Sequence, residues 1–108
     1  MNCLIKAFAI AMSMGEQDVI ASLGSDAPPH IMQLQRIALQ RGRALAKVEL
    51  MPVLDGKLVP IEWDIDRLLS GRGFIVGKSV NDIDHAIAFI DGVVYGDLYA
   101  WREIWILR

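Results

Sequence analysis

The N-terminal part of the chain has the hydrophobic pattern of helices. Cys3–Met14 is apolar on nearly every side and rich in alanine, so we predict a buried helix with Lys6 as its one charged residue. Glu16–Leu23 predicts a second, shorter helix with acidic residues in its first turn. His30–Arg41 has the apolar spacing of an amphipathic helix. Its apolar stripe consists of Ile31, Leu34, Ile37 and Ala38.

After these helices the pattern changes to short apolar runs separated by turn signals, which are typical of strands. One more short helix is predicted over Asp64–Leu69. Helices followed by antiparallel strands predict an α+β fold, with N-terminal helices packed on a C-terminal antiparallel sheet. The predicted strands are Ala44–Leu54 with a break near Pro52, Lys57–Ile61, Gly73–Gly77, His85–Ile90, Val93–Gly96 and Trp101–Leu107.

The composition indicates one domain with a surplus of apolar residues. The 108 residues are enough for a single domain, residues 1–108, with one core. Hydrophobic residues make up 54% of the chain, which is high for a small soluble protein. The longest runs without a charged residue are Ala7–Gly15 and Ala27–Gln35, far below the roughly 18 residues of a membrane helix. We therefore expect no membrane span, and we expect a homo-oligomer such as a dimer to bury the apolar surplus.

The charge and the cysteine count exclude several other classes. A net charge of −2 argues against nucleic acid and anionic lipid as partners. Cys3 is the single cysteine, so no intramolecular disulfide can form, and with His30 and His85 it provides too few ligands for structural zinc. We expect neither a metal nor a cofactor. A lone thiol, and an apolar run after Lys6 too short for a signal peptide, predict a cytoplasmic protein.

Three residues with chemically reactive side chains begin or follow predicted elements at separate points along the chain. Cys3 begins the first predicted helix, His85 begins a strand late in the chain, and Asp97 follows the next strand. This order resembles the papain-like cysteine peptidase superfamily, nearest to its compact bacteriocin-processing type and to small peptidase-like proteins of phages and bacteria. The resemblance implies a papain-like fold and a hydrolase or acyltransferase that acts on peptide or amide bonds, with a peptide or protein as substrate or partner. It is carried by Asn2-Cys3-Leu4, His30–Gly42, Gly71–Gly77, His85-Ala86-Ile87-Ala88, Asp91–Asp97 and Glu103-Ile104-Trp105.

The resemblance gives each of these residues a catalytic role. A free cysteine thiol has a pKa near 8.5, and both a helix N-terminus and a nearby imidazolium favour its reactive thiolate form. Cys3 would be the nucleophile, His85 would take the thiol proton and return it to the leaving group, and Asp97 would orient the imidazole. The oxyanion-stabilising Gln that the family carries before its cysteine has no counterpart here, so the Cys3 N–H and the Asn2 side chain would bind the oxyanion.

The length of one hairpin loop decides whether His85 can meet Asp97. A three-residue loop, Ile90-Asp91-Gly92, would pair His85 with Asp97 on one face of the sheet. A two-residue turn at Asp91-Gly92 would pair His85 with Leu98 and turn Asp97 to the other face. Gly96, which separates Tyr95 from Asp97, departs from the family's Tyr-Asp pair. Asp91 or Asp84 could then take the place of Asp97.

Two alternatives belong to other functional classes. The first is a non-catalytic binding or structural protein of phage or bacterial origin on the same scaffold, favoured by the missing Gln and the apolar surplus. The second is a nucleic-acid-binding domain that uses His30–Arg43 as a recognition helix, with Gln33, Arg36, Gln40, Arg41 and Arg43 as contacting residues. The negative net charge and the need to bury the apolar stripe of that helix argue against the second alternative. We expect His30 itself to be a residue of the helix N-terminus rather than a catalytic base.

Overall fold

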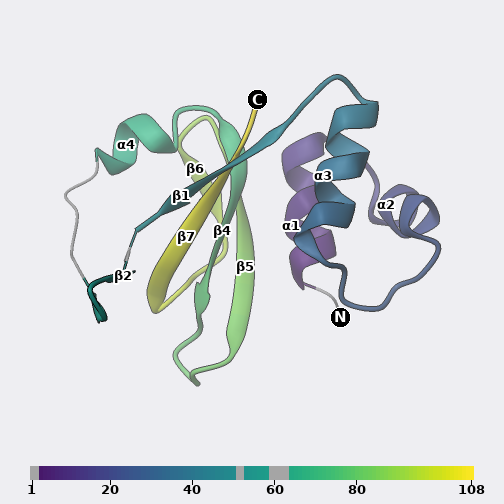
Figure 1. Ribbon diagram of the computed structural model, residues 1–108. Coiled ribbons are helices and arrows are strands. Elements are labelled where there is room, and N and C mark those ends of the chain that lie inside the picture. Colours follow the sequence, from purple (N-terminus) through teal and green to yellow (C-terminus); the bar gives the residue numbers. More distant parts are fainter. Residues whose placement is uncertain (1–2, 51–52, 59–63) are drawn as a thin grey trace.

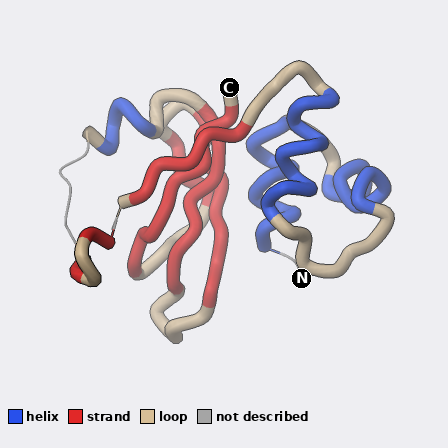
Figure 2. The backbone as a smooth tube through the Cα atoms, viewed as in Figure 1, coloured by secondary structure: helices blue, strands red, loops and turns tan. Residues whose placement is uncertain are grey.

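The computed structural model describes residues 3–50, 53–58 and 64–108. Three helices cover one face of a five-stranded antiparallel sheet, and a short helix and a small hairpin lie on the other side (Figure 1). The predicted α+β fold is therefore confirmed. Figure 2 shows the division of the chain into a helical half and a strand-rich half. The elements are α1 (Cys3–Met12), α2 (Glu16–Leu23), α3 (Ile31–Gln40), β1 (Leu45–Glu49), β2 (Val53–Leu54), β3 (Lys57–Leu58), α4 (Ile65–Leu68), β4 (Arg72–Lys78), β5 (Asp84–Ile90), β6 (Val93–Tyr95) and β7 (Ala100–Leu107).

The five-stranded sheet has the order β1-β7-β4-β5-β6, and every neighbouring pair is antiparallel. β4 is the central strand, and β1 and β6 are the edges. β2 and β3 form a separate hairpin around the predicted turn at Asp55-Gly56, where both residues have positive φ angles of 52° and 75°. The predicted break near Pro52 and the end of the predicted Lys57–Ile61 strand lie outside the described residues. None of the helices in the described part of the chain is long and apolar enough to cross a membrane.

The first helix is shorter than the predicted Cys3–Met14. It ends at Met12 because Ser13 adopts a left-handed conformation, with φ 57°, and the Met14 N–H turns back to the Ala9 carbonyl at 2.9 Å. Arg72 of β4 reaches this end of α1 and donates to the Ala11 carbonyl (3.2 Å) and to Ser13 Oγ (2.9 Å). A cation at this position compensates the negative end of the helix dipole. Arg72 therefore ties the end of α1 to the central strand.

Small residues lie between the first helix and the sheet. Ala7, Ala9 and Ala11 of α1 are buried, and they share a hydrophobic cluster with Ala86 and Ala88 of β5. α1 lies across β5 and, to a lesser extent, β4. Methyl side chains on both partners allow the helix backbone to approach the strand closely, because there is little side-chain volume between them. This close approach places the beginning of α1 beside the beginning of β5.

Aromatic rings complete the core on the helical face of the sheet. Phe8 of α1 meets Phe74 of β4 edge to face, with ring centroids 6.5 Å apart. Phe74 in turn stacks on Trp105 of β7 at 6.2 Å. Offset-stacked and edge-to-face pairs are the favourable geometries for aromatic rings. These three residues connect the first helix to the two central strands.

A second cluster covers the opposite face of the sheet. Its buried members on the strands are Ile75, Ile87, Phe89 and Ile104. Leu69, which follows α4, is buried in the same cluster, and Ile65 and Leu68 of α4 pack against it. Since Ala86 and Ala88 face the helices while Ile87 and Phe89 face α4, β5 is buried on both faces for most of its length.

Side-chain contacts begin α3 and link its middle to β1. His30 precedes the helix and accepts a hydrogen bond from the Met32 N–H through Nδ1, at 3.1 Å, while Gln33 accepts one from the His30 N–H at 2.8 Å. This capping box confirms His30 as a residue of the helix N-terminus. Further along, the Gln35 amide pairs with the backbone N–H and carbonyl of Leu45, at 2.7 and 2.9 Å. It thereby satisfies part of the open edge of β1.

The close packing of the central strands leads to a stability prediction at Gly73. A Cβ atom at this position would lie 1.9 Å from the Trp105 carbonyl oxygen and 3.0 Å from the Phe89 ring. We expect Gly73→Ala to lower the free energy of unfolding by about 3 kcal/mol, because the β4–β7 backbone pair must separate to admit the methyl group. Urea unfolding followed by circular dichroism measures this change.

Gly71 provides the matched control for that substitution. It lies two residues earlier and is exposed, and a Cβ atom at this position would have no neighbouring atom within 4 Å. Gly71→Ala should change the free energy of unfolding by no more than about 0.5 kcal/mol. Equal effects at the two glycines would contradict the packing that the structure shows at Gly73.

Candidate functional site

A pocket of about 220 Å³ opens between the first helix and the margin of the sheet. One wall comes from α1, and the other comes from β5 and the end of β6. The described residues that line it are Cys3, Lys6, Ala7, Ile10, His85, Ala86, Ile87, Ala88, Tyr95 and Gly96. Two of the sequence-predicted site residues, Cys3 and His85, are thus brought together from distant parts of the chain.

The helical wall follows from the repeat of α1. Cys3, Lys6, Ala7 and Ile10 are spaced by three, four and seven residues from the first of them, so they form one stripe along the helix. Within this stripe Ala7 is buried, Cys3 and Ile10 are half-buried, and Lys6 is exposed. The stripe itself therefore lies along the boundary between the buried side of the helix and solvent. Lys6 was not predicted as a site residue, although its position three residues after Cys3 was a usable signal.

The opposite wall exists because β6 is short. β6 pairs with only Ala88–Ile90 of β5, so the beginning of β5 has no strand of the described chain on that side. Gly96 ends the pairing with a φ of 137°, and a Cβ atom there would lie 2.7 Å from Ile87 Cγ2. Only glycine combines this backbone angle with this approach. Gly96 therefore ends the pairing where the pocket begins.

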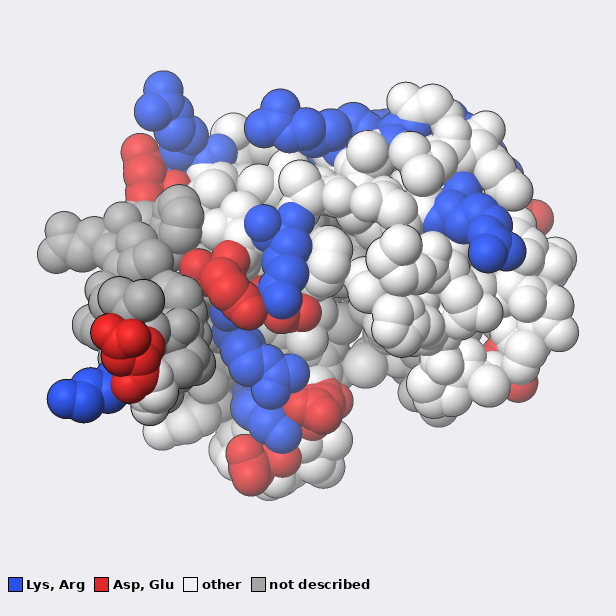
Figure 3. Space-filling model, in the orientation of Figure 1, with Lys and Arg blue, Asp and Glu red and all other residues white. Residues whose placement is uncertain are grey.

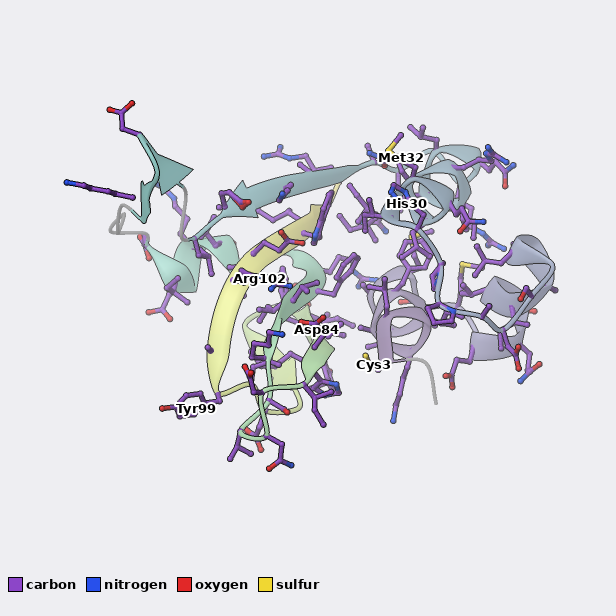
Figure 4. All side chains as sticks on the ribbon, turned by 60° about the horizontal axis from the view of Figure 1, so that its bottom comes forward. Cys3, His30, Met32, Asp84, Tyr99 and Arg102 are labelled. Atoms are coloured by element: carbon purple, nitrogen blue, oxygen red, sulfur yellow. The ribbon has the colours of Figure 1, made fainter. Side chains whose placement is uncertain are left out.

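Cys3 and His85 both line this pocket, and the alternation along β5 turns the His85 side chain toward the face of Ile87 and Phe89, opposite to α1. Cys3 is a free cysteine, half-buried, and is the first residue of α1 (Figure 4). His85 is also half-buried and is the second residue of β5. No hydrogen bond joins the two side chains in the described structure. Catalytic hydrogen bonds are often long or absent without a ligand and tighten in the complex with substrate. The pocket thus brings a cysteine and a histidine to one margin of the sheet.

Asp97 does not share this pocket. The hairpin between β5 and β6 has the two-residue turn at Asp91-Gly92, in which Ile90 pairs with Val93 and the turn residues have φ angles of 50° and 84°. The three-residue loop that would pair His85 with Asp97 is therefore wrong. The Asp-Gly dipeptide favours the two-residue turn because both positions need positive φ angles. Asp97 follows β6, is exposed, and is not among the described residues that line the pocket.

The two substitutes considered for Asp97 have other positions and partners. Asp84 forms ion pairs with Lys78 Nζ at 2.9 Å and with Arg102 Nη2 at 3.6 Å. Figure 4 shows Asp84 and Arg102 in the strand-rich half of the molecule. Asp91 lies at the far end of β5 from His85, about 20 Å away at the rise of an extended strand. Asn2, the predicted oxyanion donor, lies outside the described residues.

Most charged side chains on the sheet are paired with one another, in contrast to the pocket. In the view of Figure 3, acidic and basic side chains lie side by side over the strands, while the helices carry few charges. Lys47 contacts Glu49 at 3.1 Å and Glu103 at 3.4 Å, and these carboxylates raise the pKa of its ammonium group. In the described part of the chain, no group of three His, Cys, Asp or Glu is placed to hold a metal ion.

Comparison with known proteins finds no match: no family model, no curated protein and no solved structure is significantly similar to the chain. The resemblance to papain-like peptidases consequently stays a prediction from the residues themselves. Function is therefore inferred from the geometry of the pocket.

The ion pairs of Asp84 should be detectable as a lowered pKa of its carboxyl group. Lys78, through a hydrogen bond and its charge, and more weakly Arg102 lower the pKa of this carboxyl group below its ordinary value. We expect Lys78→Met to raise the Asp84 pKa more than Arg102→Met does, and Lys57→Met to leave it unchanged. Carbon-detected NMR titration of the Asp84 carboxyl measures the three values.

The lowered Asp84 pKa also determines how the stability of the protein depends on pH. Because the Asp84 pKa is lower in the folded state, the contribution of its ion pairs is complete above the ordinary carboxyl pKa of about 4. It is lost as the pH falls through the lower folded-state value. An Asp84 titration at or above the ordinary value in the unmodified protein would contradict these ion pairs in solution.

Proposed function

We propose that the protein is a thiol-dependent hydrolase or acyltransferase of the cysteine peptidase type, with Cys3 as nucleophile and His85 as general base. The observation that carries the proposal is that Cys3 and His85 line the same pocket. Their local settings suit these roles. Cys3 is the first residue of α1, and His85 lies at the margin of β5 that β6 leaves open.

The reaction would proceed in two balanced steps. His85 accepts the thiol proton while Cys3 Sγ forms a bond to the carbonyl carbon of a peptide or amide ligand. The carbon–nitrogen bond breaks, His85 returns the proton to the departing amine, and a thioester remains on Cys3. Water, deprotonated by His85, then attacks the thioester carbon, and the carboxylic acid product leaves as the thiolate is restored; in a transferase, an amine takes the place of water.

The oxyanion of each step needs hydrogen-bond donors. The first N–H groups of a helix have no acceptor within the helix, so the Cys3 N–H is a donor of the required kind at the required place. Asn2 stays a predicted second donor, and Asp97 stays a predicted orienting residue. The fold supports the proposal at a general level, since a helix that begins with a cysteine lies across a strand that carries a histidine at its start. A papain-like scaffold and a reducing compartment such as the cytoplasm are parts of the same proposal.

One observation favours the non-catalytic alternative, in which the protein binds a partner. Val80, Ile83 and Tyr99 are 80%, 62% and 82% exposed. They lie at the end of the sheet where His85 lies, on loops joined by the Tyr99 N–H and the Lys78 carbonyl at 3.0 Å. Exposed apolar groups of this kind are typical of contact surfaces. A homo-oligomer formed through them would bury part of the apolar surplus.

Alkylation of Cys3 by iodoacetamide tests the proposed pair. At pH 7 we expect the unmodified protein to react faster than a free thiol such as N-acetylcysteine. His85→Ala should lower this rate by about tenfold, the effect expected when an imidazolium beside a thiolate is lost. Mass spectrometry over time gives the rates, and circular dichroism shows that the variant is folded.

The second histidine of the chain supplies the control. His30→Asn keeps a capping side chain at the start of α3 and should leave the alkylation rate unchanged. Equal rates in the unmodified protein, His85→Ala and His30→Asn would reject the Cys3–His85 pair and favour the binding alternative.

Formation of a thioester on Cys3 distinguishes acyl transfer from simple alkylation of a reactive thiol. With p-nitrophenyl acetate we expect an acetyl group on Cys3 and release of p-nitrophenol, and neither in Cys3→Ala. In Asp97→Asn the same assay tests the predicted orienting role. A slower reaction would support that role, and an unchanged reaction would remove Asp97 from the site.

A further inference from the structure

The candidate pocket contains one charged side chain whose role is not covered by the nucleophile and the base. Lys6 lines the pocket one turn after Cys3, and none of the described residues that line it is an Asp or a Glu. Lys6 is exposed, and the described structure shows no ion pair or hydrogen bond for its ammonium group. By contrast, Lys47 and Lys78 are held by carboxylates. The pocket therefore presents a positive charge without a counterion from the described residues.

Apart from Lys6, none of the described residues that line the pocket is a Lys, Arg, Asp or Glu. Ala7 and Ile10 provide an apolar strip on the helix, and Tyr95 lies on the opposite wall. A ligand that fits these surfaces would combine a small apolar part with an anionic group that reaches Lys6. Cys3 and Lys6 lie on the same side of α1, so the anionic group and the carbon attacked by Cys3 would be separated by about one helical turn, roughly 5 Å.

We propose that Lys6 makes this site selective for acyl or peptide ligands that carry a carboxylate next to the reacting group. The inference rests on the proposed function for the identity of the reacting atom, Cys3 Sγ. Lys6 is a specificity residue in this assignment, because its ammonium group attracts the carboxylate and takes no part in bond making. The ligand class includes acidic side chains beside the scissile bond and a peptide C-terminus one residue away from it.

Two reagents that differ in charge isolate the electrostatic effect of Lys6. Iodoacetate and iodoacetamide both form a bond from Cys3 Sγ to a methylene carbon and release iodide, but only iodoacetate carries a carboxylate. The ratio of their rate constants removes any difference in thiolate content, since both reagents consume the same thiolate. The rates are measured at pH 8.5, because an ordinary thiol also reacts at this pH. Both rate constants, and therefore their ratio, can then be determined in every variant.

We expect the iodoacetate-to-iodoacetamide ratio to fall by about threefold to tenfold in Lys6→Gln, which is the size of a Coulomb effect over a few ångströms in a partly hydrated site. Raising the salt concentration should reduce the ratio in the unmodified protein and leave it unchanged in Lys6→Gln. Lys57→Gln, which alters an exposed lysine that does not line the pocket, should keep the ratio of the unmodified protein. An unchanged ratio in Lys6→Gln would overturn the inference.

The two proposals fail in different ways in this experiment. If Cys3 has no functional base, both reagents react at the rates of a free thiol and His85→Ala changes neither rate. The ratio would still fall in Lys6→Gln if Lys6 attracts anions. If instead Lys6 has no role, the ratio stays constant while His85→Ala slows both reagents. A folded Lys6→Arg variant should retain the ratio, because it keeps the positive charge on the same stripe of α1.

Discussion

The close contact between α1 and β5 is the interaction on which the rest of this structure depends. Ala7 and Ala11, one turn apart on α1, share a buried cluster with Ala86 and Ala88 of β5, so the helix and the sheet approach one another with little side-chain volume between them. Larger side chains here would overpack the contact, at a cost of about 1–3 kcal/mol for each. They would also move the start of the helix away from the start of the strand, and Cys3 and His85 would then no longer share a pocket.

The pocket results from this contact together with the early end of β6. The helix brings the stripe of Cys3, Lys6 and Ile10 to the margin of the sheet, and Gly96 ends the pairing of β6 before it covers the first half of β5. Cys3, His85 and Lys6 consequently meet at a strand margin that solvent can reach. The aromatic contacts of Phe8, Phe74 and Trp105 and the Arg72 link keep the helix in place on the sheet.

Local sequence patterns predict the elements better than their ends. The apolar stripe of α3 and the capping role of His30 follow from the sequence because both are properties of a single helix turn or face. The predicted end of α1 is too late, since the left-handed Ser13 is stabilised by an arginine from β4 that no local pattern reveals. For the hairpin, the Asp-Gly dipeptide indicates the correct two-residue turn, whereas the resemblance to a catalytic triad favours the other loop.

The sequence by itself determined the α+β order, the helix faces and the choice of Cys3 and His85 as candidates, because these follow from periodicity, propensity and side-chain chemistry. Only the tertiary structure decided which of the candidates meet. It placed Cys3 and His85 in one pocket, left Asp97 outside it and added Lys6. The physical reason is that strand register and helix–sheet distance depend on packing between segments far apart in the chain. A shift of one residue in a strand turns a side chain to the opposite face of the sheet.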